Sequence, residues 1–513
     1  MNTAIYAIDG GNYEQGGLAS KQLKEMLKKI GVDASAVRKT MIAAYEAEMN
    51  VVIHARKGVM KVAVDPSHVD VAVIDEGPGI PDIDRAMTEG FSTAPPVARE
   101  LGFGAGMGLP NIKRNSDRFS LQSTVNQGTH LRFAIYFAPQ RTEASVPNAV
   151  HILNEKCRQC LMCLHACPTQ AMRMRDAQPR ILDHLCIDCT SCIAVCEAGA
   201  LVLNCPPPLA SPEVATVLVV PASFFEQFGA GPGPSEIVAA LHGMGFASVR
   251  SSAEWECALR NAVDEYAQRG AVARPVLSPV CPAIVNLIQL KFPSLIAHVA
   301  PFLTPIEAAR EELRATSAAF VPACPSQQTA LRAIGTASQR EIVDPHTLRS
   351  LVAPRVAGTK RALADAPQGA SAPAFEVSGV RHVLKVLDAI ENGEMDDCDV
   401  IELFACDQGC FGSPIWKEAP FVARRRFERT GGGVGANDAA LALPREKTLQ
   451  PRPGLRLDRD MARAIEKLAQ IDELARTLPG RNCCVCGAPT CAALAEDVVA
   501  GRATVDACAY RQA

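Results

Sequence analysis

Residues 157–167 read CRQCLMCLHAC, and residues 186–196 read CIDCTSCIAVC. In both stretches four cysteines follow the spacing C-x2-C-x2-C-x3-C. Thiolates at this spacing surround one corner of an iron–sulfur cubane, while the fourth cysteine of each stretch binds the neighbouring cluster. A single stretch would also fit a zinc site or a disulfide framework, but a matched pair favours two [4Fe–4S] clusters. The predicted ligands are Cys157, Cys160, Cys163, Cys167, Cys186, Cys189, Cys192 and Cys196.

The bulk composition describes an ordinary globular chain. Its 513 residues are 48% hydrophobic and 21% charged, and the net charge is -3. This length allows several domains, and the near-neutral charge gives no indication of nucleic acid or an anionic membrane as a partner. The first residues lack the features of a signal peptide, and the best apolar run, 215–225, is too short to span a membrane. The 20 cysteines indicate a reducing, oxygen-poor cytoplasm.

Stretches rich in proline and small polar residues divide the chain. Residues 139–147 and 206–212 are predicted linkers, and residues 357–373 are predicted to form a surface loop. A charged helix is expected from residue 458 to about residue 477. We therefore predict an α/β multidomain protein with domains at residues 1–140, 148–204, 214–445 and 446–513.

Three elements in the first domain have the features of a nucleotide site. In Glu46-x3-Asn50-x3-His54, the spacing places the polar side chains on one stripe of a helix, where a carboxylate and an amide suit a general base and a Mg²⁺ ligand. Residues 73–80, VIDEGPGI, predict a strand and a glycine turn in which Asp75 can accept from an adenine amino group. Residues 102–110, GFGAGMGLP, predict a helix start that can hold phosphates.

In this order the three elements resemble the N, G1 and G2 boxes of the GHKL ATPases. The short lid and the pair Gly128-Thr129 are most similar to the anti-sigma-factor serine/threonine kinases. The resemblance covers about residues 1–137 and implies ATP and Mg²⁺ as ligands, Glu46 as the catalytic base, and a possible homodimer. A degenerate copy that binds no nucleotide is the alternative. The implied nucleotide contacts are Asn50, Asp75, Gly77, Gly79, Gly106, Met107, Gly108, Leu109 and Thr129.

A third cysteine group lies near the end of the chain, where residues 478–491 read LPGRNCCVCGAPTC. Cys483, Cys486, Cys491 and Cys508 resemble the small four-cysteine [4Fe–4S] module of redox-complex subunits and of the corrinoid iron–sulfur protein. A structural zinc ion is the alternative. Cys484 stands where that pattern usually has glycine, so we predict that it is not a ligand.

The central domain carries cysteines in three short segments, SPVCPAI at 278–284, FVPACP at 320–325 and ELFACDQGCFG at 402–412. By spacing alone these would be ordinary buried cysteines. Their order, after a two-cluster module, resembles the signature segments of the [FeFe]-hydrogenase large subunit. The resemblance implies one further [4Fe–4S] cluster, bound by Cys281, Cys324, Cys406 and Cys410.

Two positions depart from the hydrogenase pattern. Val280 stands where the family has a proton-relaying cysteine, and Gln327 stands where it has a lysine that contacts the diiron subcluster. Valine carries no proton, and a neutral amide replaces a cation. We therefore do not expect hydrogen turnover, and a cubane without the diiron group is the expectation. The remaining thiols, expected to be incidental, are Cys205, Cys257, Cys398 and Cys484.

These features together predict an iron–sulfur protein that transfers electrons, with ATP binding or hydrolysis coupled to the transfer. The doubled cysteine run and the terminal group favour this function, which requires a redox partner protein. The alternative is a redox-sensing regulator whose GHKL domain phosphorylates a regulatory partner, and the kinase-like ATP site favours that class. A scaffold with structural clusters is a third class. ATP must bind two conformations differently in either of the first two, because a ligand without that preference shifts no equilibrium.

Overall fold

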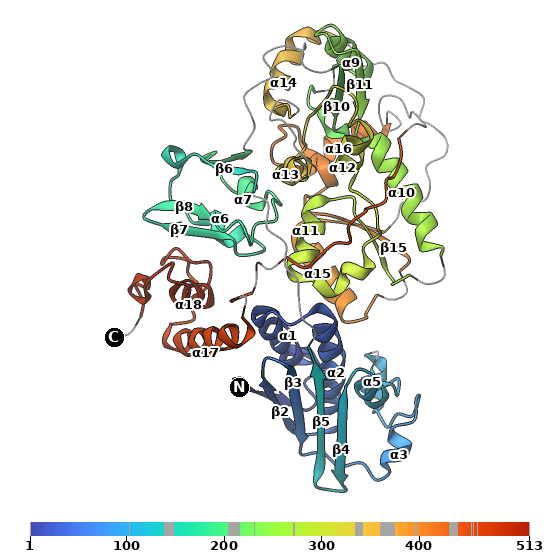
Figure 1. Ribbon diagram of the computed structural model, residues 1–513, viewed down its shortest axis with the longest axis vertical. Coiled ribbons are helices and arrows are strands. Elements are labelled where there is room, and N and C mark those ends of the chain that lie inside the picture. The colour runs from blue at the N-terminus through green and yellow to red at the C-terminus, as the bar shows by residue number, and fades with distance from the viewer. Residues whose placement is uncertain are drawn as a thin grey trace.

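The computed structural model describes residues 2–511 except residues 102, 138–147, 204–215, 230, 270–271, 334–341, 360–374, 396–397, 430–439, 453, 455 and 459. The two predicted linkers and most of the predicted surface loop therefore lie outside the described residues, and so do Gly102 and Cys205. The predicted domain limits stay predictions. Helices and parallel and antiparallel strands are all present, which confirms the α/β multidomain class (Figure 1). No helix of the described part is both long and apolar enough to cross a bilayer.

The amino-terminal region is a five-stranded antiparallel sheet with helices on one face (Figure 1). Alternate residues of β2 and β3 are buried, because only one face of the sheet meets the helices. The strand order is β1-β2-β3-β5-β4. The elements are β1 (Asn2–Asp9), η1 (Tyr13–Gln15), α1 (Leu18–Ile30), α2 (Ala34–His54), β2 (Lys57–Val64), β3 (His68–Asp75), α3 (Ile83–Ala86), α4 (Pro96–Glu100), α5 (Gly108–Arg114), β4 (Arg118–Thr124) and β5 (Gly128–Tyr136).

The next region is small and contains the doubled cysteine run. Two antiparallel strand pairs, β6 with β9 and β7 with β8, frame two short helices. Its core is correspondingly small, so cluster binding would supply much of its stability. The elements are β6 (Val150–Ile152), η2 (Asn154–Lys156), α6 (Met162–Ala166), β7 (Met172–Arg175), β8 (Gln178–Ile181), α7 (Ser191–Ala194) and β9 (Leu201–Leu203).

The central region contains two three-stranded parallel sheets, ordered β11-β10-β13 and β12-β15-β14. Parallel strands need helical crossovers, and the helices cover the sheets. The elements are β10 (Val217–Val220), α8 (Ala222–Phe225), α9 (Pro234–His242), β11 (Ser248–Ser251), α10 (Ala253–Ala267), β12 (Val276–Ser278), α11 (Pro282–Lys291), η4 (Pro293–His298), α12 (Pro305–Glu312), β13 (Ala318–Phe320), α13 (Pro325–Ala333), α14 (Pro345–Val352), η6 (Ala353–Arg355), β14 (Phe375–Ser378), α15 (Val380–Glu391), β15 (Val400–Phe404), η7 (Gly409–Gly412) and α16 (Pro420–Arg429).

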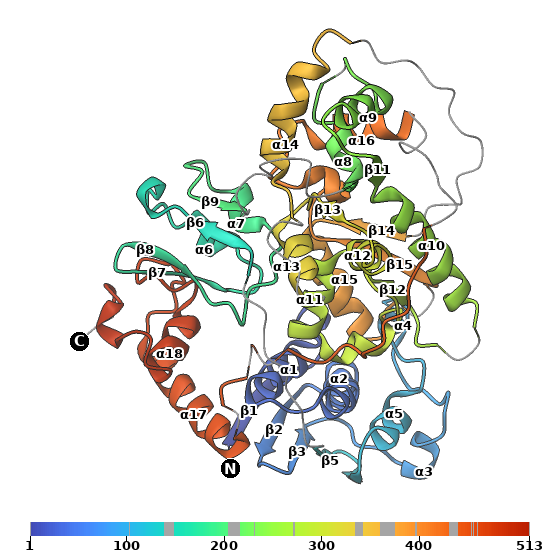
Figure 2. The same ribbon diagram turned by 45° about the horizontal axis from the view of Figure 1, so that its top comes forward.

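The carboxyl-terminal region returns to the start of the chain. Its first helix begins after the N-cap Asp460, close to the predicted start, and packs on α1 and β1 (Figure 2). Ala464 and Leu468 of this helix belong to the core of the amino-terminal sheet domain, whereas Ile471 belongs to the core of the terminal cysteine module. One helix therefore joins the two cores. The elements are α17 (Met461–Thr477), α18 (Cys491–Val499) and η9 (Val505–Ala507).

A buried charge cluster joins the amino-terminal domain to the central region. Lys24 and Lys28 of α1 both pair with Glu391 at the end of α15, and all three side chains are almost fully buried. The two ammonium groups also lie over the ring of Phe292, 5.5 and 5.0 Å from its centroid. Burial alone would raise the pKa of Glu391, but the two lysines outweigh it and hold this pKa below its ordinary value.

Glu391→Ala is expected to destabilise the protein by about 3–5 kcal/mol, because it removes the buried carboxylate that Lys24 and Lys28 share and leaves Lys24 only Asp388, at 3.6 Å. Asp388→Ala on the same helix is the matched control: Asp388 is 38% exposed, so its loss should cost less than about 1 kcal/mol. Urea unfolding followed by fluorescence measures both. Because the folded pKa of Glu391 is lowered, its contribution is complete above its unfolded pKa near 4.5 and is lost as the pH falls further. Equal losses in the two variants would contradict this role.

Candidate nucleotide pocket and cysteine groups

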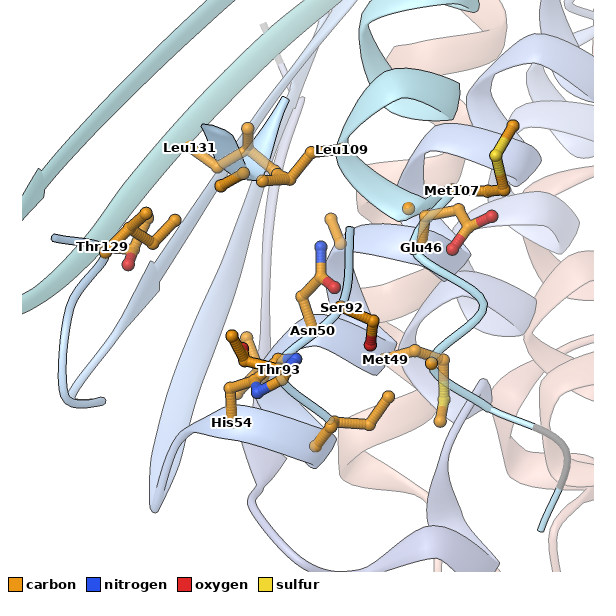
Figure 3. A pocket seen from close by; sticks show the side chains of 18 of the residues that line it. Glu46, Met49, Asn50, His54, Ser92, Thr93, Met107, Leu109, Thr129 and Leu131 are labelled. Carbon is orange, nitrogen blue, oxygen red and sulfur yellow. The ribbon is translucent and has the colours of Figure 1, made fainter. Parts of the chain in front are cut away.

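A cavity of about 640 Å³ opens between α2, β3, β5 and the glycine segment before α5 (Figure 3). Asn50 lies between Glu46 and His54 on the α2 side, as the spacing of four predicted, and Thr129 lies on the opposite side. Gly77 lines an adjoining cavity instead. The predicted nucleotide residues that line the main cavity are Glu46, Asn50, Asp75, Gly79, Gly106, Met107, Gly108, Leu109 and Thr129.

Asp75 defines one end of this cavity. Its Oδ1 accepts hydrogen bonds from the backbone N–H of Gly77 at 2.8 Å and of Thr129 at 3.2 Å. Gly128 permits this approach, because it has φ +96° and an added Cβ would lie 2.0 Å from the carbonyl oxygen of Asp75. The carboxylate is thereby fixed at the base of the cavity, in the position expected for an anchor of the adenine amino group. Burial lowers the pKa of His54 nearby, so at neutral pH this imidazole is uncharged.

Glu46 defines the other end. Its Oε1 accepts a hydrogen bond from Asn111 Nδ2 at 2.8 Å, which orients the carboxylate toward the cavity. A Cβ on Gly108 would lie 3.2 Å from Glu46 Oε2 and 3.3 Å from Asn50 Oδ1, so the glycine leaves a cradle beside both groups. Gly106 has φ +77°, which an L side chain adopts only with strain. The cradle, a base and an amide oxygen fit the triphosphate of Mg-ATP.

The first cysteine run and the last cysteine of the second surround one small cavity. Cys157, Cys160, Cys163 and Cys196 line it together, as the exchange of fourth ligands predicts. Backbone N–H groups are aimed at the sulfurs, from Gln159 to Cys157 at 3.4 Å and from Ala200 to Cys196 at 3.3 Å. Four free thiols with such donors fit one cubane.

The other four cysteines of the doubled run form the complementary group. Burial, and after it the neighbouring Cys167, raise the pKa of the Cys189 thiol to about 11. Such a thiol holds its proton at neutral pH unless a metal displaces it. Backbone N–H groups of Ala171 and Asp188 point at the sulfurs of Cys167 and Cys186, at 3.2 and 3.4 Å. This donor set fits the second cubane.

The central cysteines gather at the carboxyl ends of parallel strands. Cys281 follows β12, Cys324 follows β13, and Cys406 follows β15. The sheets therefore bring together segments that are far apart in the chain, and the electrostatic neighbours of Cys410 include all three. Burial raises the pKa of Cys406 to about 12. The first N–H groups of α11 and α13 point at Cys281 and Cys324, which favours charge on sulfur once iron is bound.

The two departures from the hydrogenase pattern lie beside this group. Val280 is buried next to Cys281. The side chain of Gln327 accepts from the N–H of Ala323 at 2.7 Å and donates toward the sulfur of Cys410 at 3.9 Å. The neutral amide of Gln327 therefore stands where the hydrogenase pattern has a lysine, and the N–H of Ala323 holds it in place.

The terminal cysteine module docks on the β7–β8 hairpin. The N–H of Met174 donates to Gly487 at 2.8 Å, and Asp497 pairs with Arg173 and Arg175. Cys483, Cys486, Cys491 and Cys508 are free and lie around the start of α18 and its return segment. Burial, and then the neighbouring Cys508 and Cys483, raise the pKa of Cys486. Within the described residues, no group of three or more His, Cys, Asp or Glu side chains is arranged to hold a single metal ion.

Sequence reasoning missed two contacts that connect neighbouring cysteine groups. They give the order terminal, first ferredoxin-type, second ferredoxin-type and central, which we call the line of cysteine groups. Thr190 Oγ1, between two ligands of the second ferredoxin-type group, lies 3.5 Å from Cys406 Sγ. At the other end, Cys484 of the terminal module is buried against the ferredoxin-type region. Its sulfur lies 3.7 Å from Nδ1 of the exposed His165. The glycine-to-cysteine departure at position 484 was the available signal. Cys257 and Cys398 lie outside the four groups.

Comparisons with known proteins divide the chain in the same way. Residues 12–135 match the profile "Histidine kinase-like ATPase domain", and residues 149–197 match "4Fe-4S dicluster domain". Residues 213–320 match "Iron only hydrogenase large subunit, C-terminal domain", and residues 478–510 match "Putative Fe-S cluster".

Curated relatives match the first of these regions. The serine/threonine-protein kinase RsbT of Bacillus subtilis (strain 168) is 33% identical over 120 residues, which cover 22% of this chain and 84% of RsbT. The chain belongs, through its first domain, to the histidine kinase-like ATPases. The anti-sigma F factor of Thermoanaerobacter sp. (strain X514) is 31% identical over 104 residues, 19% of this chain and 69% of that protein. The GHKL resemblance of the sequence is confirmed.

Solved structures match about half of the chain. A variant of the apo [FeFe]-hydrogenase HydA1 from Chlamydomonas reinhardtii aligns over 48% of this chain and 90% of its own, with 14% identity and a TM-score of 0.32. The profiles matched at residues 12–135, 149–197 and 213–320 make the chain a histidine kinase-like ATPase domain joined to ferredoxin and hydrogenase-like domains.

Asp75→Asn is expected to weaken ATP binding about 10- to 100-fold, because the amide cannot accept from two backbone N–H groups and from adenine at once. Asp70→Asn is the matched control: it lies on the same strand and pairs with Arg132 at the surface. Calorimetric titration with Mg-ATP measures both. Unchanged affinity in Asp75→Asn would remove this residue from the nucleotide site.

Cys406→Ser is expected to remove one cluster, so that iron falls from about sixteen to about twelve atoms per chain. Cys257→Ser is the control, because Cys257 is exposed and belongs to no group. Iron and sulfide analysis of anaerobically purified protein gives the count. A wild-type value near eighteen would indicate a diiron group beside this cluster.

Proposed function

We propose that this protein carries electrons through four [4Fe–4S] clusters and that ATP binding or hydrolysis in the GHKL domain is coupled to this transfer. The single observation that supports the proposal best is the line of four cysteine groups, joined by the Cys484–His165 and Thr190–Cys406 contacts. When bound, the clusters supply one-electron carriers. A sensor would need one such group, whereas a line of four suits transport.

The two ends of the line differ in exposure. Cys483 of the terminal module and Cys160 of the first ferredoxin-type group are exposed, whereas the four central thiols are not. A redox partner protein can therefore approach the terminal and ferredoxin modules closely. The central group lies inside the hydrogenase-like domain, where its four thiols are partly buried.

The proposed activity does not include hydrogen evolution. Val280 offers no proton to the central group, and Gln327 is bound to the N–H of Ala323. A side chain with a titratable proton is needed for a relay. The central group is therefore proposed to hold a cubane that accepts or passes on electrons.

In the nucleotide site we propose Glu46 as the general base and Asn50 as the Mg²⁺ ligand. Asp75, Gly79 and Thr129 are proposed to surround adenine, Gly77 to hold the Asp75 carboxylate through its N–H, and residues 106–109 to contact phosphate. Asn111 orients Glu46 through the hydrogen bond to its Oε1. The attacking group is water in an ATPase and a protein hydroxyl in a kinase, and the carboxylate would accept its proton in both cases.

A second candidate is a redox-controlled serine/threonine kinase that acts on a regulatory partner protein. The identity of 33% with a serine/threonine-protein kinase over the first domain favours it. In this reading the cluster state changes the activity of the first domain through the buried contact with Glu391. A homodimer stays a prediction from the resemblance.

Mg-ATP is expected to change the rate of cluster reduction at least threefold in the anaerobic wild-type protein, because the two nucleotide states would favour different conformations. Glu46→Ala should bind ATP but lose the hydrolysis-dependent part of this change. Glu473→Ala, an exposed change on α17, is the control. Stopped-flow absorbance and electron paramagnetic resonance follow the clusters. Identical reduction with and without ATP would overturn the coupling, and labelled phosphate on a partner protein would then favour the kinase.

A further inference from the structure

The nucleotide cavity is not formed by the first domain alone. Gly393 and Glu394, which follow α15 in the hydrogenase-like domain, line the same cavity as Glu46 and Asn50. Neither residue belongs to a motif that the sequence offered for the nucleotide site. A side chain of one domain thus faces the ligand position of the other.

Glu394 lies at the Glu46 end of the cavity. Tyr45, the neighbour of Glu46 on α2, has its pKa raised by burial and then by the carboxylates of Glu394, Glu46 and Glu48, in that order. Asp75 occupies the opposite end, beside Thr129. If Asp75 holds adenine, the outermost phosphate lies near Glu46, and therefore near Glu394.

The segment that carries Glu394 is fixed to its helix. The backbone N–H of Glu394 donates to Ala389 at 3.0 Å, and that of Gly393 donates to Ile390 at 3.0 Å. Glu391, three residues before Glu394, is buried between Lys24 and Lys28. A force on Glu394 therefore acts on α15 and on the domain contact.

The other end of α15 meets the loop of the central cysteine group. The N–H of Gly379 donates to Phe404 at 3.0 Å, and the N–H of Val380 donates to Ala405 at 2.9 Å. Cys406 is the next residue in the chain. A Cβ on Gly379 would lie 2.3 Å from Asp407 Oδ1, so the helix start and this loop are in close contact. One helix of 12 residues thus extends from the nucleotide cavity to a predicted cluster ligand.

The charge of the cavity decides what Glu394 does there. Four carboxylates line it, and Arg85 is the one arginine or lysine that the described lining contains; the carboxylates are Glu46, Asp75, Asp82 and Glu394. The γ-phosphate adds negative charge at the Glu46 end, whereas ADP leaves that position to water. A carboxylate near this position repels ATP more than ADP, and Mg²⁺ reduces the difference.

We infer that Glu394 senses the γ-phosphate for the hydrogenase-like domain, and that α15 connects this signal to the loop of Cys406. The inference rests on the proposed binding of ATP and deepens it, because it names the residue that distinguishes ATP from ADP. The inference requires that the ATP-bound and the ADP-bound protein favour different positions of α15. Repulsion between Glu394 and the γ-phosphate is the proposed cause of this difference. By linkage, the reduction state of the central group then changes the affinity for ATP by the same factor.

The test compares Glu394→Gln with Glu265→Gln in the full-length, anaerobically purified protein. Glu265 is exposed on α10 of the same domain, so its variant controls for the loss of one surface charge. Calorimetry gives the dissociation constants of ATP and ADP, with EDTA and with Mg²⁺, at low and high salt. Glu394→Gln is expected to shift the ATP-to-ADP affinity ratio about three- to tenfold in favour of ATP at low salt, most strongly in EDTA. High salt should reduce the shift.

An affinity ratio in Glu394→Gln within twofold of the wild-type ratio would overturn the inference, whatever ATP does to the clusters. A shift of the same size in Glu265→Gln would overturn it as well, because the effect would then be one of net charge. The electron paramagnetic resonance signal of the central cluster is the second readout. The difference between its ATP and ADP forms should shrink in Glu394→Gln. A wild-type protein that binds ATP but reduces identically with ATP and ADP would refute the coupled function and the link through α15, while the affinity shift would still locate Glu394 at the γ-phosphate.

Discussion

The arrangement of the domains depends on one buried carboxylate. Lys24 and Lys28 pair with Glu391 at the contact between α1 and α15, and the three side chains are 4%, 5% and 1% exposed. Such a cluster adds little net stability over an apolar contact, but it penalises every arrangement that separates the charges. Because α1 also pairs with the terminal module through Lys29 and Glu496, this helix contacts both the hydrogenase-like domain and the terminal module.

A few side-chain contacts also connect the cysteine groups to one another. The terminal module is attached to the ferredoxin-type hairpin by Asp497, which pairs with Arg173 and Arg175. The second ferredoxin-type group reaches the central group through Thr190 and Cys406. Each connection uses one or two side chains between elements that are themselves rigid. The proposed electron path and the proposed nucleotide signal then meet at one loop, which follows β15 and begins with Cys406.

Much of the site was visible in the sequence, for a physical reason that differs between its parts. The spacing of the doubled run is set by the size of a cubane, so it identifies ligands without knowledge of the fold. The spacing of four between Glu46 and Asn50 follows from the helical repeat, and both residues line the cavity. Cys281, Cys324 and Cys406 have no such local spacing. The family resemblance grouped them, and the structure shows that Cys281 and Cys406 follow neighbouring parallel strands of one sheet, whereas Cys324 follows a strand of the other sheet.

The sequence by itself determined the local chemistry: thiols at cluster spacing, a helix stripe with a carboxylate and an amide, and glycines where the backbone must approach a ligand. Only the tertiary structure decided how these sites are related. Arg173 and Asp497 meet although they are 324 positions apart, and Glu394 enters a cavity built by residues 45–131. Such contacts depend on which faces of separate domains pack together. That packing is the sum of many weak, non-local terms, and no short pattern in the chain records it.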